Sequence, residues 1–153
     1  MGLKNLLIIL TSFVLVLTLA SCGSGQQAEQ NNIQESSSMR LLINNSEVSV
    51  SWENNESVAA LTDLVKAEPL EVNMSMYGGF EQVGSLGKSL PRNDKQTTTQ
   101  AGDIVLYSGN QIVLFYGSNS WAYTRLGRIT DKSASELTQL LGNGNVTICL
   151  RTP

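Results

Sequence analysis

Hydrophobic and polar residues alternate along several stretches of the chain after residue 38, and this period of two predicts β-strands. The stretch MRLLINNSEVSVSW, which begins at Met39, contains two such runs on either side of Asn44 and Asn45. Asparagine tolerates the positive φ angles of tight turns, so we expect a β-hairpin here. The stretch GDIVLYSGNQIVLFYG contains two strand-like runs joined through Ser-Gly-Asn at 108–110, and it predicts a second hairpin.

Shorter stretches predict the remaining strands, which we place over residues 70–76, 123–130 and 145–151. In the first of these, every second residue from Leu70 to Met76 is apolar, so these side chains share one face. Residues 77–100 are rich in glycine and polar residues and have little periodicity. We therefore expect a long loop there, and long loops inside compact domains are often functional.

Two stretches have the period of a helix instead. The first is NNESVAALTDLVKA, whose apolar residues fall on one helical face and whose first turn is capped by either Asn54 or Asn55. The second is SASELTQLLGNG, in which Ser133 and Glu136 have the spacing of a capping box. The sequence therefore predicts two short helices.

The predicted elements indicate a mainly β fold. About seven or eight strands and two short helices are expected, without the βαβ repetition of a parallel sheet. This order favours a closed or nearly closed antiparallel β-barrel with the helices at its ends. The length of 153 residues and the apolar content of 41% suit one domain of ordinary size, which we place at residues 39–153.

The composition excludes several classes of chemistry. The chain has no histidine, which removes Ser-His-Asp and Cys-His machinery and histidine zinc sites. Its two cysteines, Cys22 and Cys149, provide neither a disulfide framework nor a metal cluster, and we expect no metal and no cofactor. The net charge of -3, with the basic residues scattered, argues against nucleic acid as a partner.

The N-terminal segment, residues 1–21, has the pattern of an export signal. Lys4 precedes a mostly apolar stretch, and small residues follow before Cys22. The apolar stretch is shorter than the roughly 20 residues that span a bilayer, so a transmembrane anchor is the less favoured alternative. We therefore expect this segment to be a cleaved signal peptide.

The sequence Leu-Ala-Ser-Cys at 19–22 resembles the lipobox of bacterial lipoproteins, although Ser21 replaces the commoner glycine or alanine. The resemblance implies that Cys22 carries a diacylglyceryl thioether and becomes the first residue of the mature chain. It also implies a lipid anchor on the extracytoplasmic face of a bacterial membrane, in the cell envelope. A secreted protein with a free Cys22 is the alternative. Residues 22–38 are almost entirely polar, which predicts a flexible tether.

Motifs of the domain resemble the bacterial cyclophilin-like domain family. They are MYGGFEQVGSLGKSLP, AGDIVLYSGNQIVLFYG and RLGRI, in this order, and the likeness extends from Met39 to about Leu150. The resemblance implies an eight-stranded cyclophilin-type barrel. Prolyl isomerases of that superfamily use an arginine in a groove of Phe, Gln, Trp and His. Because this chain lacks histidine and the Phe-His-Arg segment, we assign it no catalytic residue.

A candidate groove is expected around the 77–100 loop and the neighbouring strands. Aromatic and charged side chains beside glycines suit an extended peptide or a small ligand. For the glycines of the loop, the favoured interpretation is structural: they allow positive φ angles and tight packing. The candidate residues are Tyr77, Phe80, Glu81, Arg92, Trp121, Tyr123 and Arg125.

The sequence therefore predicts a membrane-tethered domain that binds a ligand or a peptide without catalysis. The alternative is a divergent peptidyl-prolyl cis-trans isomerase acting on exported proteins, with an arginine polarising the prolyl amide. Arg92, Arg125 and Arg128 all remain open for that role, because nothing in the sequence selects one of them.

Overall fold

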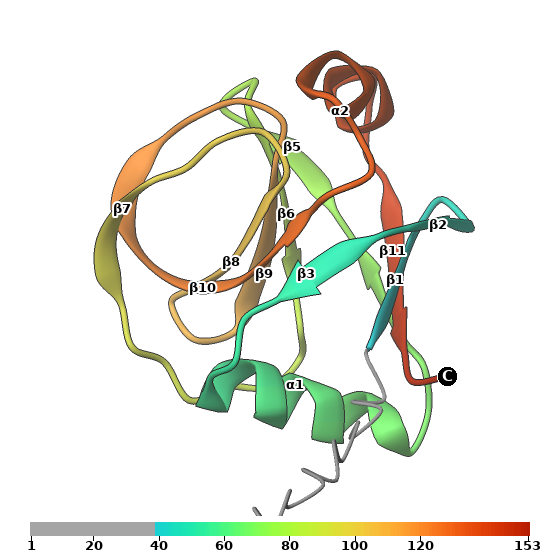
Figure 1. The fold of residues 1–153 in the computed structure, drawn as a ribbon, viewed down its shortest axis with the longest axis vertical. Coiled ribbons are helices and arrows are strands. Elements are labelled where there is room, and N and C mark those ends of the chain that lie inside the picture. Colours follow the sequence, from blue (N-terminus) through green and yellow to red (C-terminus); the bar gives the residue numbers. More distant parts are fainter. Residues whose placement is uncertain (1–38) are drawn as a thin grey trace, which may run out of the picture. The chain divides into compact units, whose positions relative to one another are not determined.

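A computed structural model describes residues 39–153, which form two antiparallel sheets and two helices (Figure 1). The first sheet has the order β2 (Ser46–Val48), β1 (Arg40–Ile43), β11 (Thr147–Arg151), β4 (Leu70–Asn73). The second has the order β3 (Val50–Trp52), β10 (Ser120–Ile129), β8 (Asp103–Tyr107), β9 (Gln111–Phe115), β6 (Glu81–Ser85), β5 (Ser75–Tyr77), and β7 (Lys95–Thr98) pairs with β10. The predicted signal peptide, the lipid attachment at Cys22 and the predicted tether lie outside the described residues.

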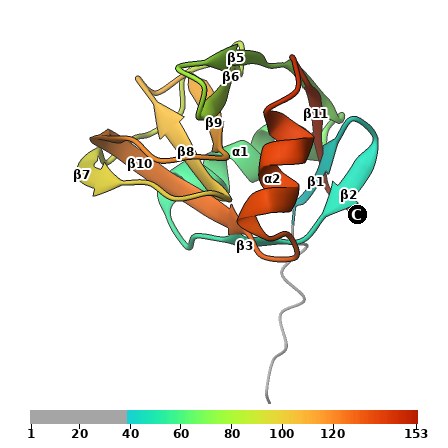
Figure 2. The ribbon, with the colours of Figure 1, turned by 90° about the horizontal axis from the view of Figure 1, so that it is seen from above.

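Both predicted helices are present, and they lie at opposite ends of the sheets (Figures 1 and 2). Helix α1 (Glu56–Lys66) begins at Asn55, whose side chain accepts a hydrogen bond from the backbone N–H of Val58. Of the two capping residues that the sequence offered, Asn54 and Asn55, the structure therefore uses Asn55. Helix α2 (Ala134–Leu141) has the predicted capping box between Ser133 and Glu136. Neither helix of residues 39–153 is long and apolar enough to cross a bilayer.

Both predicted hairpins are confirmed. Asn44 and Asn45 connect β1 to β2 with φ angles of 47° and 66°. Ser108 and Gly109 connect β8 to β9 with φ angles of 52° and 80°. The residues that tolerate a positive φ thus stand where the turns require them.

The prediction of a closed barrel is wrong, because neither sheet closes on itself within residues 39–153. The chain passes from one sheet to the other at Ser49, between β2 and β3, and at Met74, between β4 and β5. Each of these runs was predicted as one strand, and each is two short strands in different sheets. Such corners turn one sheet away from the other and interrupt the pairing between them.

The region 77–100, predicted as a loop, contains β6 and β7. Strand β6 escapes the alternation pattern because its polar residues Glu81 and Gln82 point to opposite faces and are both buried. Strand β7 is entirely polar and mostly exposed. Strand β10 is also longer than the predicted 123–130 segment, because its first residues pair with β7.

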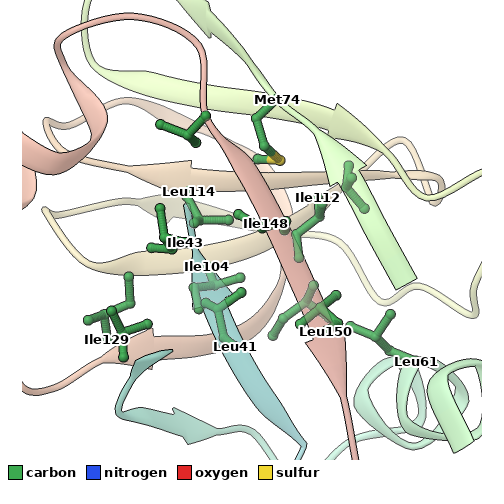
Figure 3. Packing of buried hydrophobic residues seen from close by; sticks show 14 of the residues in the cluster. Leu41, Ile43, Leu61, Met74, Ile104, Ile112, Leu114, Ile129, Ile148 and Leu150 are labelled. Atoms are coloured by element: carbon green, nitrogen blue, oxygen red, sulfur yellow. The ribbon is translucent and has the colours of Figure 1, made fainter. Parts of the chain in front are cut away.

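The main core fills the space between the two sheets (Figure 3). Leu41 and Ile148 of the first sheet pack towards Ile104 and Leu114 of the second, and Leu61 of α1 covers one end. A second apolar cluster lies on the opposite face of the second sheet, because successive side chains of a strand alternate between faces. It consists of Val105, Val113, Phe115 and Tyr123, with Phe80 and Val83 packed against it.

Candidate functional site

A pocket of about 350 Å³ lies on the face of the second sheet that carries this second cluster. Its walls come from β5, β6, β8, β9 and β10 and from the segment before β10. The lining residues are Tyr77, Glu81, Val83, Tyr107, Gln111, Val113, Asn119, Trp121 and Tyr123. The pocket thus combines an apolar floor with aromatic walls and few polar groups, which is the usual character of a ligand site.

The floor and walls of the pocket support one another. Val83 of β6 and Val113 of β9 are cross-strand partners and pack in the second cluster. The ring of Tyr123 meets Phe115 edge-on, at a centroid distance of 5.7 Å, and also meets Tyr107 at 6.1 Å. These contacts hold Tyr123 in one orientation, so the aromatic wall is formed without a ligand.

Glu81 is the polar centre of the pocket. Its residue is only 6% exposed, and its Oε2 has no hydrogen-bond partner among residues 39–153. Burial raises the pKa of this carboxyl from 4.5 to about 7, because the charged form loses hydration. The carboxyl therefore exchanges a proton near neutral pH, at a residue that lines the pocket and has one buried oxygen without a donor among residues 39–153.

Asn119 fixes the polar edge of the pocket. Its Nδ2 donates to the hydroxyl of Tyr123 over 3.0 Å. Its backbone is held by Thr99, whose N–H donates to the Asn119 carbonyl over 2.8 Å and whose Oγ1 accepts from the Asn119 N–H over 3.0 Å. Burial, followed by the charge of Glu81, raises the pKa of Tyr123, so its phenol stays neutral and available as a hydrogen-bond partner.

The turn between β5 and β6 sets Tyr77 and Glu81 opposite each other. Gly78 and Gly79 have φ angles of 62° and 75°, and a side chain at Gly78 would overlap the ring of Phe80. Phe80 stacks on Phe115 with an interplanar angle of 1°. Glycine therefore has a structural role at position 78, because both the turn and the packing of Phe80 require a residue without a side chain.

Two of the predicted arginines lie in a separate, polar pocket of about 500 Å³ on the other side of Tyr123. Arg125 contacts Asp103, with 3.0 Å between Nη2 and Oδ1, and Arg128 contacts the same oxygen at 3.0 Å. Asp103 is fully buried and also accepts from the backbone N–H of Gln100. Arg92 is 3.4 Å from Asp94. The contacts of Arg92 and Arg125 with carboxylates place them in structural ion pairs.

The structure brings Tyr77, Glu81, Trp121 and Tyr123 together in one pocket. Of the surface of Trp121, 58% is exposed to solvent, although the residue lines the pocket. The other predicted residues separate from them. Phe80 packs against the second cluster instead of lining the pocket, while Arg92 and Arg125 line the polar one.

Sequence reasoning missed the other lining residues, which are Val83, Tyr107, Gln111, Val113 and Asn119. A signal for part of this set was present in the runs DIVLY and QIVLF, which are apolar at nearly every position. Such runs are typical of strands covered on both faces, whereas a half-exposed strand alternates. They indicated a second apolar surface outside the main core.

No group of three metal-ligating side chains occurs in the described part of the chain. The chemistry of the aromatic pocket comes instead from one carboxyl, two amides, the phenols and an indole. These groups bind and orient a ligand by hydrogen bonds, charge and aromatic contact.

Comparison with known proteins places this geometry in a family. The family model described as the Cyclophilin-like family matches residues 41–151. The solution structure of the hypothetical protein AF2241 from Archaeoglobus fulgidus is similar, with a TM-score of 0.56 and 17% identity over 75% of this chain and 93% of that one. This likeness concerns the fold alone. No curated protein sequence matches the chain. The predicted kinship is thus confirmed, and the chain belongs to the Cyclophilin-like family.

Proposed function

We propose that the chain is a lipid-anchored protein of the bacterial cell envelope whose cyclophilin-like domain binds a small molecule or a side chain of a peptide, without catalysis. The observation that carries the binding role is the buried carboxyl of Glu81, which lines an aromatic pocket and whose Oε2 has no hydrogen-bond partner among residues 39–153. A buried polar group without a partner costs about 1–3 kcal/mol. A ligand that donates to this oxygen recovers that free energy, which favours a binding site at this position.

Binding is favoured over prolyl isomerisation by the placement of the arginines. An arginine that polarises a prolyl amide has to reach the aromatic groove, but Arg92 and Arg125 line the neighbouring pocket. The guanidinium groups of Arg125 and Arg128 are also paired with the buried Asp103. We therefore expect the full chain to leave the cis/trans exchange rate of an Xaa-Pro peptide unchanged in exchange NMR. An acceleration that Arg125→Ala abolishes would favour the isomerase.

Chemical-shift mapping tests the binding role. The full chain, labelled with ¹⁵N, is titrated with a set of small fragments that contains cationic, neutral and anionic members. The largest shifts are expected at the residues that line the aromatic pocket, such as Gln111, Val113 and Asn119. A set that gives no saturable shift at these residues would contradict the proposal.

A pair of variants serves as the control for this experiment. Trp121→Ala removes an exposed aromatic wall of the pocket and is expected to weaken fragment binding by about tenfold. Met76→Ala removes another exposed apolar side chain that lies outside the pocket lining, and it is expected to leave binding unchanged. Equal effects of the two substitutions would mean that the fragments bind elsewhere.

A further inference from the structure

We propose that the aromatic pocket takes a primary alkylammonium group, with the Glu81 carboxylate as its counter-ion and hydrogen-bond acceptor. This inference rests on the proposed function, because it names the chemistry of the ligand that the pocket binds. The ammonium group is carried either by a small amine or by a lysine side chain of a peptide.

The charges around the pocket favour a cation. Among the described residues that line it, Glu81 is the only one with a carboxyl group, and none is basic. The nearby basic residues Arg92, Lys95 and Arg125 line the polar pocket instead. A carboxylate in such a poorly hydrated site gains more from a cation than an exposed carboxylate does, because the local dielectric constant is low.

The aromatic walls favour the same ligand class. Tyr77, Tyr107, Trp121 and Tyr123 surround the space beside Glu81. The faces of Trp and Tyr rings attract cations, with about 0.5–1 kcal/mol per contact at exposed sites and about 2 kcal/mol when the cation is desolvated. A carboxylate within an aromatic cage thus supplies both partners that an organic cation uses.

The hydrogen bonds distinguish a primary ammonium from a quaternary one. The Oε2 of Glu81 has no donor among residues 39–153, and a primary ammonium brings three N–H donors. The side-chain amide of Gln111 also lines the pocket and offers a further acceptor. A quaternary ammonium has no N–H to donate to the Glu81 carboxyl, so it is expected to bind more weakly.

Binding of an alkylammonium depends on the ionisation of Glu81. The other titratable groups that line the pocket are Tyr77 from β5, Tyr107 from β8 and Tyr123 from β10. The amine stays protonated below about pH 10. With the pKa of Glu81 at about 7 in the free protein, the affinity for an alkylammonium is expected to rise about tenfold from pH 6 to pH 8.

Titration calorimetry of the full chain with matched probes tests the inference. At pH 8, n-butylammonium is expected to bind at least tenfold more tightly than 1-butanol, which has a similar shape without charge. It is also expected to bind more tightly than tetramethylammonium, which carries the same charge but has no N–H donors. Nα-acetyl-lysine N-methylamide, whose side-chain ammonium group is free, distinguishes the two sources of the ligand. Binding as tight as that of n-butylammonium indicates a lysine side chain, and much weaker binding indicates a small amine. Both results support the inference.

Variants tie the effect to Glu81. Glu81→Gln keeps the shape of the side chain and is expected to abolish both the preference for n-butylammonium and its pH dependence. Glu71→Gln removes a charge from the exposed face of β4 in the other sheet and is expected to preserve both. Trp121→Ala, at an exposed position, is expected to weaken the binding of n-butylammonium more than that of 1-butanol.

The outcomes separate this inference from the proposed function. Equal binding of 1-butanol and n-butylammonium, or an unchanged preference in Glu81→Gln, would overturn the inference. Neutral or anionic fragments that map to the pocket while n-butylammonium does not would also overturn it and leave the proposed function standing. The absence of any fragment at the pocket would overturn both.

Discussion

At the scale of single residues, two neighbouring polar side chains of β6 serve opposite faces of the second sheet. Gln82 is fully buried, and its Nε2 donates to the carbonyls of Leu141 and Gly144 over 2.6 and 2.7 Å. It therefore joins β6 to the end of α2. Glu81 points to the other face and lines the pocket without such partners. One of the pair stabilises the fold, and the other is available to a ligand.

Gln82→Ala is expected to lower the free energy of unfolding by about 2–4 kcal/mol, because it removes the donor from one buried carbonyl, that of Leu141, and one partly buried carbonyl, that of Gly144. Urea denaturation of the full chain measures this loss. Gln96→Ala on the exposed part of β7 is the matched control, with an expected change within about 0.5 kcal/mol. A similar small change in Gln82→Ala would mean that its hydrogen bonds contribute little.

Glu81 is expected to make stability fall as the pH rises from about 4.5 to about 7. Its pKa is about 7 in the folded protein and has its ordinary value of 4.5 in the unfolded chain, so the folded state binds more protons in this window. The free energy of unfolding therefore decreases across the window and levels off above it. Denaturation curves of the wild type and Glu81→Gln, measured from pH 4 to pH 8, give the difference. If the free energies of unfolding of the wild type and of Glu81→Gln change with pH in the same way, the raised pKa of Glu81 would be contradicted.

At the scale of elements, the turn between β5 and β6 supports the pocket through Phe80. Gly78 and Gly79 both have positive φ, but only at Gly78 does an added side chain meet the Phe80 ring, while the space beside Gly79 is open. A substitution at Gly79 therefore tests backbone strain alone, whereas one at Gly78 tests backbone strain together with crowding against Phe80.

Gly78→Ala is expected to destabilise the protein by about 2–3 kcal/mol and Gly79→Ala by about 1 kcal/mol, because both pay for the left-handed conformation and only the first displaces Phe80. Thermal unfolding measures both. Gly78→Ala is also expected to weaken ligand binding, since Phe80 stacks on Phe115 behind Tyr123. Equal losses in the two variants would show that Phe80 moves aside freely.

Elements whose periodicity and cap or turn chemistry agree were predictable from the sequence. The helices, with Asn55 and the Ser133 capping box, and both hairpins are of this kind. The corners at Ser49 and Met74 were not predictable, because the alternation of side chains continues across them while the pairing partner changes. Strand β6 was missed because its first two residues are polar and yet buried. Only the tertiary structure buries them, and only there does Gln82 find its acceptor while Oε2 of Glu81 has none among residues 39–153.

At the scale of the whole molecule, the pocket depends on topology more than on any one segment. The sequence pointed to Tyr77, Glu81, Trp121 and Tyr123 as aromatic and charged residues in or beside the predicted 77–100 loop and the 123–130 strand. Tyr107 belongs to the predicted hairpin of β8 and β9, but its place beside Glu81 follows from the long-range pairing of β9 with β6. The arginines separate from the aromatics for the same reason.

The location of the molecule is a separate prediction, which depends on Cys22. Cys22→Ser is expected to abolish incorporation of a fatty-acid analogue and to leave the precursor uncleaved, because the thiol is the site of lipid attachment in the lipobox. Metabolic labelling followed by gel analysis measures both effects. Cys149→Ser, which changes the free cysteine of β11, is the control and is expected to retain labelling. Labelling that persists in Cys22→Ser would contradict the anchor.

The titration of Glu81 tests the binding account most directly. In the full chain, the ¹³C resonance of its carboxyl carbon is followed against pH, with and without n-butylammonium. The account predicts a midpoint at about 7 in the free protein, because the carboxyl is buried in the pocket without a partner, and a lower midpoint with the amine. A midpoint at the ordinary value of 4.5 that the amine does not move would contradict it.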